Sequence, residues 1–376
     1  MTEQLKLKLN DSKATRWGAL VIVAFTMMAA YYVNDVVAPL KTMLETDLAW
    51  SSTDFGFFTG GYSFLNVFFL MLIWGGLILD RFGIRFTGKL ATILMVGGTA
   101  LEYYAMTGLA GADATLFGIN EIFGYKTGVF VAFAGYSIFG VGAEVAGITV
   151  SKIIAKWFKG KELATAMGVQ VALARIGSQA GYAVAIPLAR AFGISTPVLL
   201  GLVLLLGGMI AFFVFAVMDK KLDKQMEAAA IAAGTEDEEE KFSFKDVKNI
   251  LVNPGFWLIA LLCVLFYSCV FPFQKFASEL MIIKYGINEN VAGTFAGLPA
   301  LGALILTPVF GGFIDKRGKS ASIMLLGSAM LICVHFIYAI PDINYWLVAI
   351  VLMIILGIAF SLVPSACGRL WPRYSR

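Results

Sequence analysis

Two residues of opposite charge lie within long apolar stretches, where charge is rare. Glu144 lies in the stretch 128–150, and Arg175 lies near the middle of the stretch 164–188. A charged side chain within a bilayer is costly unless it is paired or hydrated, so it marks a functional site by default. A carboxylate can take an ammonium group and a guanidinium can take a carboxylate, so the pair suits a zwitterionic solute. A structural ion pair between the two helices is the alternative interpretation.

Other polar groups in apolar stretches are further candidates for contact with a solute. Asp35 either lines a vestibule or is solvated at the membrane interface, and Tyr62 either donates a hydrogen bond or packs. Gln274 and Lys275 follow Pro272, which frees a backbone carbonyl and favours a kink beside a cavity. Lys275 either binds a solute carboxylate or extends toward the headgroups.

Two further titratable side chains carry open alternatives. Glu102 lies toward one end of its stretch, where it is either a proton-coupling group or a solvated edge. His335 is the single histidine, and packing is a better interpretation than a proton relay. Several glycines are predicted to let helix backbones approach closely: Gly135, Gly140, Gly142, Gly147, Gly177 and Gly181.

The composition and the motifs exclude several classes of protein. Hydrophobic residues make up 59% of the 376 residues and charged residues only 14%, about half the usual charged share of a soluble domain. The four cysteines lack metal-ligand spacing, and no nucleotide-binding Gly-rich loop occurs. We therefore expect no enzyme, no cofactor, no bound metal and no nucleic-acid partner.

Ten stretches are long and apolar enough to cross a bilayer as helices, which needs about 20 residues each. Transmembrane strands would instead be short and alternating. The ten predicted spans are 17–39, 53–79, 86–109, 128–150, 164–188, 195–218, 255–278, 291–314, 321–340 and 345–364.

The basic residues predict the orientation of these spans. With the N-terminus in the cytoplasm, 23 of the 29 Lys and Arg residues fall on the cytoplasmic side, which satisfies the positive-inside rule. The C-terminus then also lies in the cytoplasm. A charged segment containing EDEEE divides the spans into six and four, and it is best interpreted as a linker. The predicted parts are a tail (1–16), a six-helix bundle (17–218), a linker (219–254), four helices (255–366) and a second tail (367–376).

A short motif occurs twice, after the second and the eighth span. The first copy is GLILDRFGIR, with Gly76, Asp80, Arg81, Gly83 and Arg85; the second is GGFIDKRGK, with Gly311, Asp315, Lys316, Gly318 and Lys319. An acid and a base beside a helix end suit a conformational latch better than a substrate site. Parallel repeats are typical of carriers whose two halves rock about a central site.

The duplicated motif and the division into halves resemble the major facilitator superfamily over about residues 17–366. A narrower resemblance involves Gly-x-Gly-Ala-Glu at 140–144, Trp-Phe-Lys-Gly-Lys-Glu-Leu at 157–163, Ala-Arg-x-Gly-Ser at 174–178 and FYSCVFPFQKFASELM at 266–281. These segments are similar to the branch of lysosomal dipeptide carriers and their bacterial relatives. In that branch, the residues that match Glu144 and Arg175 belong to the substrate motif.

The resemblance implies an all-α membrane protein with the two-bundle fold, here with ten predicted helices because the family's last two are missing from the sequence. We expect a secondary or facilitative carrier of a dipeptide or amino-acid-like zwitterion in the inner or plasma membrane. The alternatives are a carrier of another organic anion or sugar and a non-transporting receptor. The expected partners are the solute and lipid, with proton coupling left open; a monomer is expected, with room for an accessory subunit.

Overall fold

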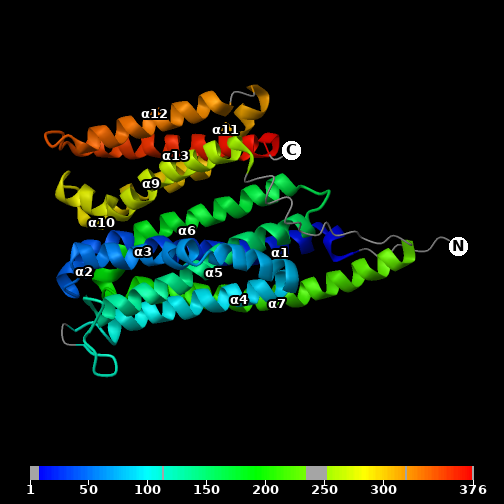
Figure 1. Cartoon of the computed structure of the whole chain (residues 1–376), viewed down its shortest axis with the longest axis horizontal. Helices are drawn as coiled ribbons and strands as arrows, with labels where there is room; N and C mark the ends of the chain where they lie inside the picture. The colour runs from blue at the N-terminus through cyan, green and yellow to red at the C-terminus, as the bar shows by residue number, and fades with distance from the viewer. Residues whose placement is uncertain (1–7, 112–113, 234–251, 318–319, 375–376) are drawn as a thin grey trace. The chain divides into compact units, whose positions relative to one another are not determined.

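The computed structural model describes residues 8–111, 114–233, 252–317 and 320–374. The chain divides into two compact units, Met1–Asp237 and Glu238–Arg376, and each is described by itself. The described residues are helical apart from short connections and one small hairpin (Figure 1). That composition agrees with the all-α prediction, and the hairpin was not predicted.

Unit 1 contains six long helical segments together with short 3₁₀ and α-helical turns. Their bounds are η1 (Leu9–Asp11), α1 (Lys13–Val36), η2 (Ala38–Leu40), α2 (Lys41–Asp47), α3 (Ser52–Phe68), α4 (Met71–Thr107), α5 (Thr127–Trp157), α6 (Leu163–Phe192) and α7 (Thr196–Ala233). The hairpin strands β1 (Glu121–Ile122) and β2 (Tyr125–Lys126) connect α4 to α5. Segment 219–233, predicted as the start of the linker, continues α7 without a break.

Local sequence explains several helix ends in unit 1. Ser51 and Asp54 form a reciprocal capping box at the start of α3, in which each side chain accepts from the other's backbone N–H. Gly193, with φ +103°, ends α6 in a backbone conformation that favours glycine. Gly83, with φ +76°, interrupts α4, so that α4 comprises two helical arms, 71–82 and 84–107.

Close backbone contacts hold the helices of unit 1 together. α4 packs along α5, α1 lies against α6 and α7, and α3 packs on α5. A Cβ atom on Gly177 would lie 2.1 Å from the Met28 carbonyl oxygen, and one on Gly140 would lie 2.3 Å from that of Tyr62. The predicted small-residue contacts are therefore confirmed at these two positions. They are also confirmed at Gly135, Gly142 and Gly181, where the same distance is 2.9 Å or less. The prediction is wrong at Gly147, where the nearest atom is 3.9 Å away.

Unit 2 contains α9 (Pro254–Ile283), α10 (Glu289–Ala296), α11 (Leu298–Arg317), α12 (Ser320–Ala339) and α13 (Trp346–Tyr374). α13 packs against α9, α11 and α12. Asn253 caps α9 by accepting from the Gly255 N–H, with Pro254 in the first turn. Lys284 donates to the carbonyl oxygens of Tyr338 and Ile340 at 2.7 and 2.6 Å, which satisfies the end of α12.

The number of spans differs from the ten predicted. Among the described residues, seven helices are long and apolar enough to cross a membrane, or eight if α3 and α4 form one broken span bent by 57°. Two features explain the difference. The predicted spans 53–79 and 86–109 both fall in the bent α3–α4 pair. The helix α6, which carries Arg175, is not among the helices apolar enough to cross a membrane. The predicted count of ten is therefore not confirmed.

Candidate functional site

A cluster of polar side chains lies within unit 1, and it includes both oppositely charged residues singled out from the sequence. Glu144 is on α5 and Arg175 is on α6. The Tyr62 hydroxyl donates a hydrogen bond of 2.8 Å to Glu144 Oε1. The Arg175 guanidinium carbon lies 5.6 Å from the centre of the Tyr31 ring, within the range of a cation–π contact.

Tyr31 on α1 connects the acid to the base. Its hydroxyl lies within electrostatic reach of Arg175, Glu144 and Asp35. Glu144 accepts its hydrogen bond from Tyr62 on α3, while Arg175 lies over the Tyr31 ring of α1. The acid and the base thus each contact a tyrosine within one polar cluster.

The cluster continues to Asp35 through a third tyrosine. Tyr136 on α5 donates to the backbone and side-chain oxygens of Asn34, at 2.7 and 3.1 Å, and its ring centre lies 5.6 Å from that of Tyr62. The Asn34 amide donates to Asp35 Oδ1 at 2.8 Å. Asp35 therefore belongs to the same polar cluster as Tyr62.

Sequence reasoning missed Tyr31 and Tyr136. Both lie in helices otherwise rich in apolar residues, where a tyrosine is usually a packing residue. The one available signal was spacing: Tyr31 precedes Asp35 by one helical turn, which places the two on one face of α1.

Glu102 is close to this cluster but is not solvated. Its side chain is fully buried in α4, and it lies within electrostatic reach of Tyr136. The alternative that placed Glu102 at a solvated edge is therefore wrong. The predicted contacts Gln274 and Lys275 lie in unit 2, on the part of α9 that follows Pro272.

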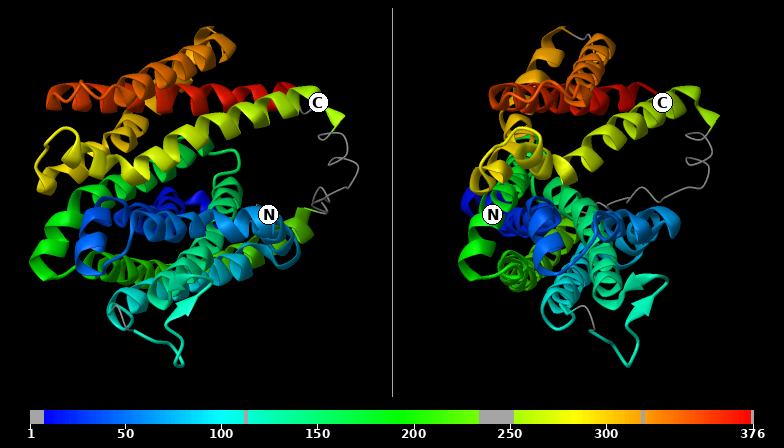
Figure 2. Two further views of the ribbon diagram at one scale, coloured as in Figure 1. Left: turned by 60° about the vertical axis from the view of Figure 1, so that its left-hand side comes forward. Right: turned by 90° about the vertical axis from the view of Figure 1, so that its left-hand side faces the viewer.

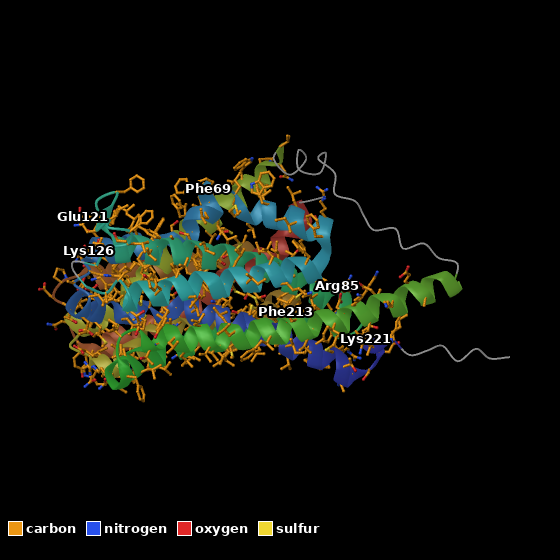
Figure 3. All side chains as sticks on the ribbon, turned by 90° about the horizontal axis from the view of Figure 1, so that it is seen from below. Phe69, Arg85, Glu121, Lys126, Phe213 and Lys221 are labelled. Carbon is orange, nitrogen blue, oxygen red and sulfur yellow. The ribbon has the colours of Figure 1, made fainter. Side chains whose placement is uncertain are left out.

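A second set of charges gathers at the end of unit 1 near the N-terminus, which we call the basic end. Figure 3 shows Arg85 and Lys221 toward this end, and Glu121 and Lys126 at the opposite end. Asp219 of α7 is fully buried and accepts from Lys156 at 2.7 Å and from the Trp157 indole N–H at 3.0 Å. Arg85 donates to Asp219 at 3.4 Å and to Asp223 at 2.5 Å.

The duplicated motif takes part in this network through its first copy. Gly83 forms the turn, Arg85 pairs with α7, and Asp80 accepts from Lys152 of α5 at 2.9 Å. Arg81 lies over the ring of Phe82, and a Cβ on Gly76 would meet open space. In the second copy, a Cβ on Gly311 would also meet open space, and Asp315 and Lys316 belong to the last turn of α11. Gly318 and Lys319 lie outside the described residues.

The Trp-Phe-Lys-Gly-Lys-Glu-Leu segment attaches the N-terminal segment to the basic end. Glu162 accepts from Arg16 at 3.0 Å and from the Trp17 indole N–H at 3.2 Å, and Lys161 donates to Asp11 at 2.5 Å. The Arg16 hydrogen bond lowers the pKa of Glu162, and the Lys161 hydrogen bond lowers that of Asp11. Because both pKa values are lowered on folding, these contacts stabilise the protein fully above the ordinary carboxyl pKa, and the stabilisation is lost as the pH falls through the lowered, folded-state pKa values.

We expect Asp219→Ala to destabilise unit 1 more than Asp223→Ala does. Removing the buried carboxylate leaves the buried Trp157 N–H without its acceptor, which costs about 2–3 kcal/mol, while Lys156 keeps Asp223 at 2.5 Å. Asp223 is 40% exposed, so water replaces it at a cost of less than about 1 kcal/mol. Thermal unfolding of the two purified variants measures the difference, and equal melting temperatures would contradict this role for Asp219.

Comparison with known proteins agrees with this fold. Residues 19–375 match the Major Facilitator Superfamily, so the chain belongs to that family of membrane transporters. It is similar to the lysosomal dipeptide transporter MFSD1 of Homo sapiens, at 28% identity over 96% of this chain and 72% of the relative. The MFSD1 of Danio rerio is 26% identical over 94% of this chain and 72% of the relative.

Solved structures resemble the chain in fold. A structure from work on substrate recognition in proton-dependent oligopeptide transporters superimposes with a TM-score of 0.64 at 13% identity, over 96% of this chain and 84% of that one. The xylose transporter XylE from E. coli superimposes with a TM-score of 0.58 at 15% identity, over 96% and 88%. The family match and the apolar helices together show an integral membrane protein of a transporter family, and the named relatives are dipeptide transporters.

Proposed function

We propose that this protein moves a dipeptide or a similar zwitterion across a membrane by alternating access. The observation that carries the proposal is the presence of Glu144 and Arg175 in one polar cluster, where Tyr62 donates to Glu144 and Arg175 lies over Tyr31. Glu144 would take the solute's ammonium group and Arg175 its carboxylate, and Tyr62 and Tyr31 would hold these two side chains in place. The names of the MFSD1 relatives support this substrate class.

We further propose that Asp35, Gln274 and Lys275 also contact the solute, and that the Asp80 and Asp315 motifs act as conformational latches. The basic end would lie in the cytoplasm, because Lys13, Arg16, Lys152, Lys156 and Lys161 gather there. Under this proposal both termini are cytoplasmic and the protein lies in the inner or plasma membrane.

Uptake into proteoliposomes tests the substrate class. We expect a labelled dipeptide to enter faster than a free amino acid, and a neutral sugar such as xylose to enter no faster than into protein-free vesicles. Repeating the assay with an inward proton gradient tests coupling, for which the buried Glu102 is the candidate group; Glu102→Gln would then abolish the stimulation. Uptake of xylose in preference to the dipeptide would favour a sugar carrier, and no uptake by folded protein would favour a receptor.

A further inference from the structure

The connection between α4 and α5 contains one four-residue pattern twice. Leu-Phe-Gly-Ile occupies 116–119 and Ile-Phe-Gly-Tyr occupies 122–125. In each copy the first and last residues pair in antiparallel fashion. The two central residues have positive φ: 54° and 81° at Phe117 and Gly118, and 53° and 80° at Phe123 and Gly124. Both turns therefore have the left-handed conformation of a type I′ hairpin turn. We call 116–126 the double-turn hairpin.

Phenylalanine is an unusual residue at the first central position of such a turn. Asn, Asp and Gly are favoured there because a Cβ with an aromatic ring crowds the backbone at positive φ. The two rings are also among the most exposed in the protein, at 95% for Phe117 and 88% for Phe123. Each is thus disfavoured both by its backbone and by its contact with water. Strain repeated at two equivalent positions indicates that the rings have a contact of their own.

The hairpin that presents these rings is firmly attached to unit 1. Thr127 donates its backbone N–H to Asn120 at 2.9 Å and its hydroxyl to Ile119 at 2.8 Å. Lys126 donates to the Ala49 carbonyl oxygen at 2.5 Å. The Tyr125 ring stacks on Phe57 of α3 with centres 3.9 Å apart. The two tips are therefore held in fixed positions and project from the helices, as Figure 2 shows.

The tips lie at the level where the membrane-crossing helices of unit 1 end. Phe123 lies 6.0 Å from Phe130, in the first turn of α5, between ring centres. From there Phe133 and Phe57 stack at 4.2 Å and Phe64 follows at 5.2 Å from Phe133. This aromatic series reaches Phe68 on α3, which is 73% exposed on the apolar surface of the bundle. The Phe123 tip is thus continuous with an exposed apolar surface of α3.

We propose that Phe117 and Phe123 insert into the bilayer at its headgroup–acyl boundary and anchor the end of unit 1 opposite the basic end. The occupant of this surface is lipid: aromatic and apolar side chains at this depth exchange water for acyl chains while the polar backbone of the turns stays hydrated. Insertion removes the exposure of both rings to water.

Collision accessibility of a nitroxide label tests the proposal on the full chain. The four cysteines are first replaced by Ala, and single labels are then attached after Phe117→Cys, Phe123→Cys or, as controls on the same hairpin, Asn120→Cys and Glu121→Cys. The protein is reconstituted in phosphatidylcholine vesicles and exposed to oxygen, which concentrates in lipid, and to a nickel chelate, which stays in water. We expect oxygen collisions to exceed nickel collisions at 117 and 123 and the reverse at 120 and 121.

Nickel accessibility at 117 and 123 as high as at 121 would overturn the proposal and would point to a protein partner for the two rings. An unlabelled variant gives an independent result. The double variant Phe117→Asn, Phe123→Asn places a favoured residue in each turn. If the hairpin were exposed to water, the melting temperature of the protein should therefore stay the same or rise. We expect instead a lower melting temperature in vesicles, because the lipid contact is lost. An unchanged or higher value would also contradict insertion.

Discussion

Arg175→Ala is expected to reduce dipeptide uptake at low substrate concentration by about 30-fold or more. Removing one partner of a charge-assisted pair costs about 2–5 kcal/mol, and each 1.4 kcal/mol corresponds to about a tenfold change. Arg175 lies over Tyr31 and within the polar cluster of α1, α3, α5 and α6. The loss should therefore appear as weaker binding while the protein remains folded.

Arg175→Lys separates charge from shape. Lysine keeps the positive charge but loses the planar fork that grips a carboxylate and stacks on a ring. We expect uptake between that of the parent and that of Arg175→Ala. Arg190→Ala is the matched control, because Arg190 lies on the same helix in its last turn; it should retain most of the uptake. Equal uptake by the parent and Arg175→Ala would remove Arg175 from the substrate site.

Gly140→Ala is expected to destabilise unit 1 by about 2–3 kcal/mol, the cost of overpacking a close-packed contact. The added Cβ would lie 2.3 Å from the Tyr62 carbonyl oxygen, which is rigid backbone and cannot rotate away as a side chain could. α3 and α5 must then separate, and the Tyr62 to Glu144 hydrogen bond lengthens with them. Uptake and melting temperature should fall together.

Gly147→Ala on the same helix provides the control. A Cβ there would meet only the Met27 methyl carbon, at 3.9 Å, and alanine favours the helix over glycine by about 1 kcal/mol. We expect an unchanged or slightly raised melting temperature from thermal unfolding. Equal melting temperatures for Gly140→Ala and Gly147→Ala would show that the close backbone contact between α3 and α5 does not limit stability.

The sequence predicted those features that one residue type or one spacing determines. Glu144 and Arg175 could be singled out because a charged residue within an apolar stretch is recognisable from the sequence alone, and a charge placed in a bilayer is costly. The duplicated motif at Asp80 and Asp315 indicated the family. Five of the six glycines chosen as close contacts meet backbone or side chains within 2.9 Å.

Features that depend on a partner from elsewhere in the chain could not be predicted. Asp219 resembled the start of a polar linker, and only the packing of α7 shows that Lys156, Arg85 and Trp157 surround it. The bend between α3 and α4 occurs at Leu70, which has φ +52° with no glycine or proline to signal it. Gly83 signals a turn, but the flanking residues are helical up to it on both sides.

Blocked dipeptides test the central claim most directly: that Glu144 and Arg175 each take one end of a zwitterion. Inhibition of uptake is measured with an N-acetylated dipeptide, which lacks the ammonium group, and with a C-amidated dipeptide, which lacks the carboxylate. The parent should discriminate against both. Glu144→Gln should lose discrimination only against the acetylated form, and Arg175→Ala only against the amidated form. Unaltered discrimination in both variants, with uptake preserved, would contradict this assignment of the site.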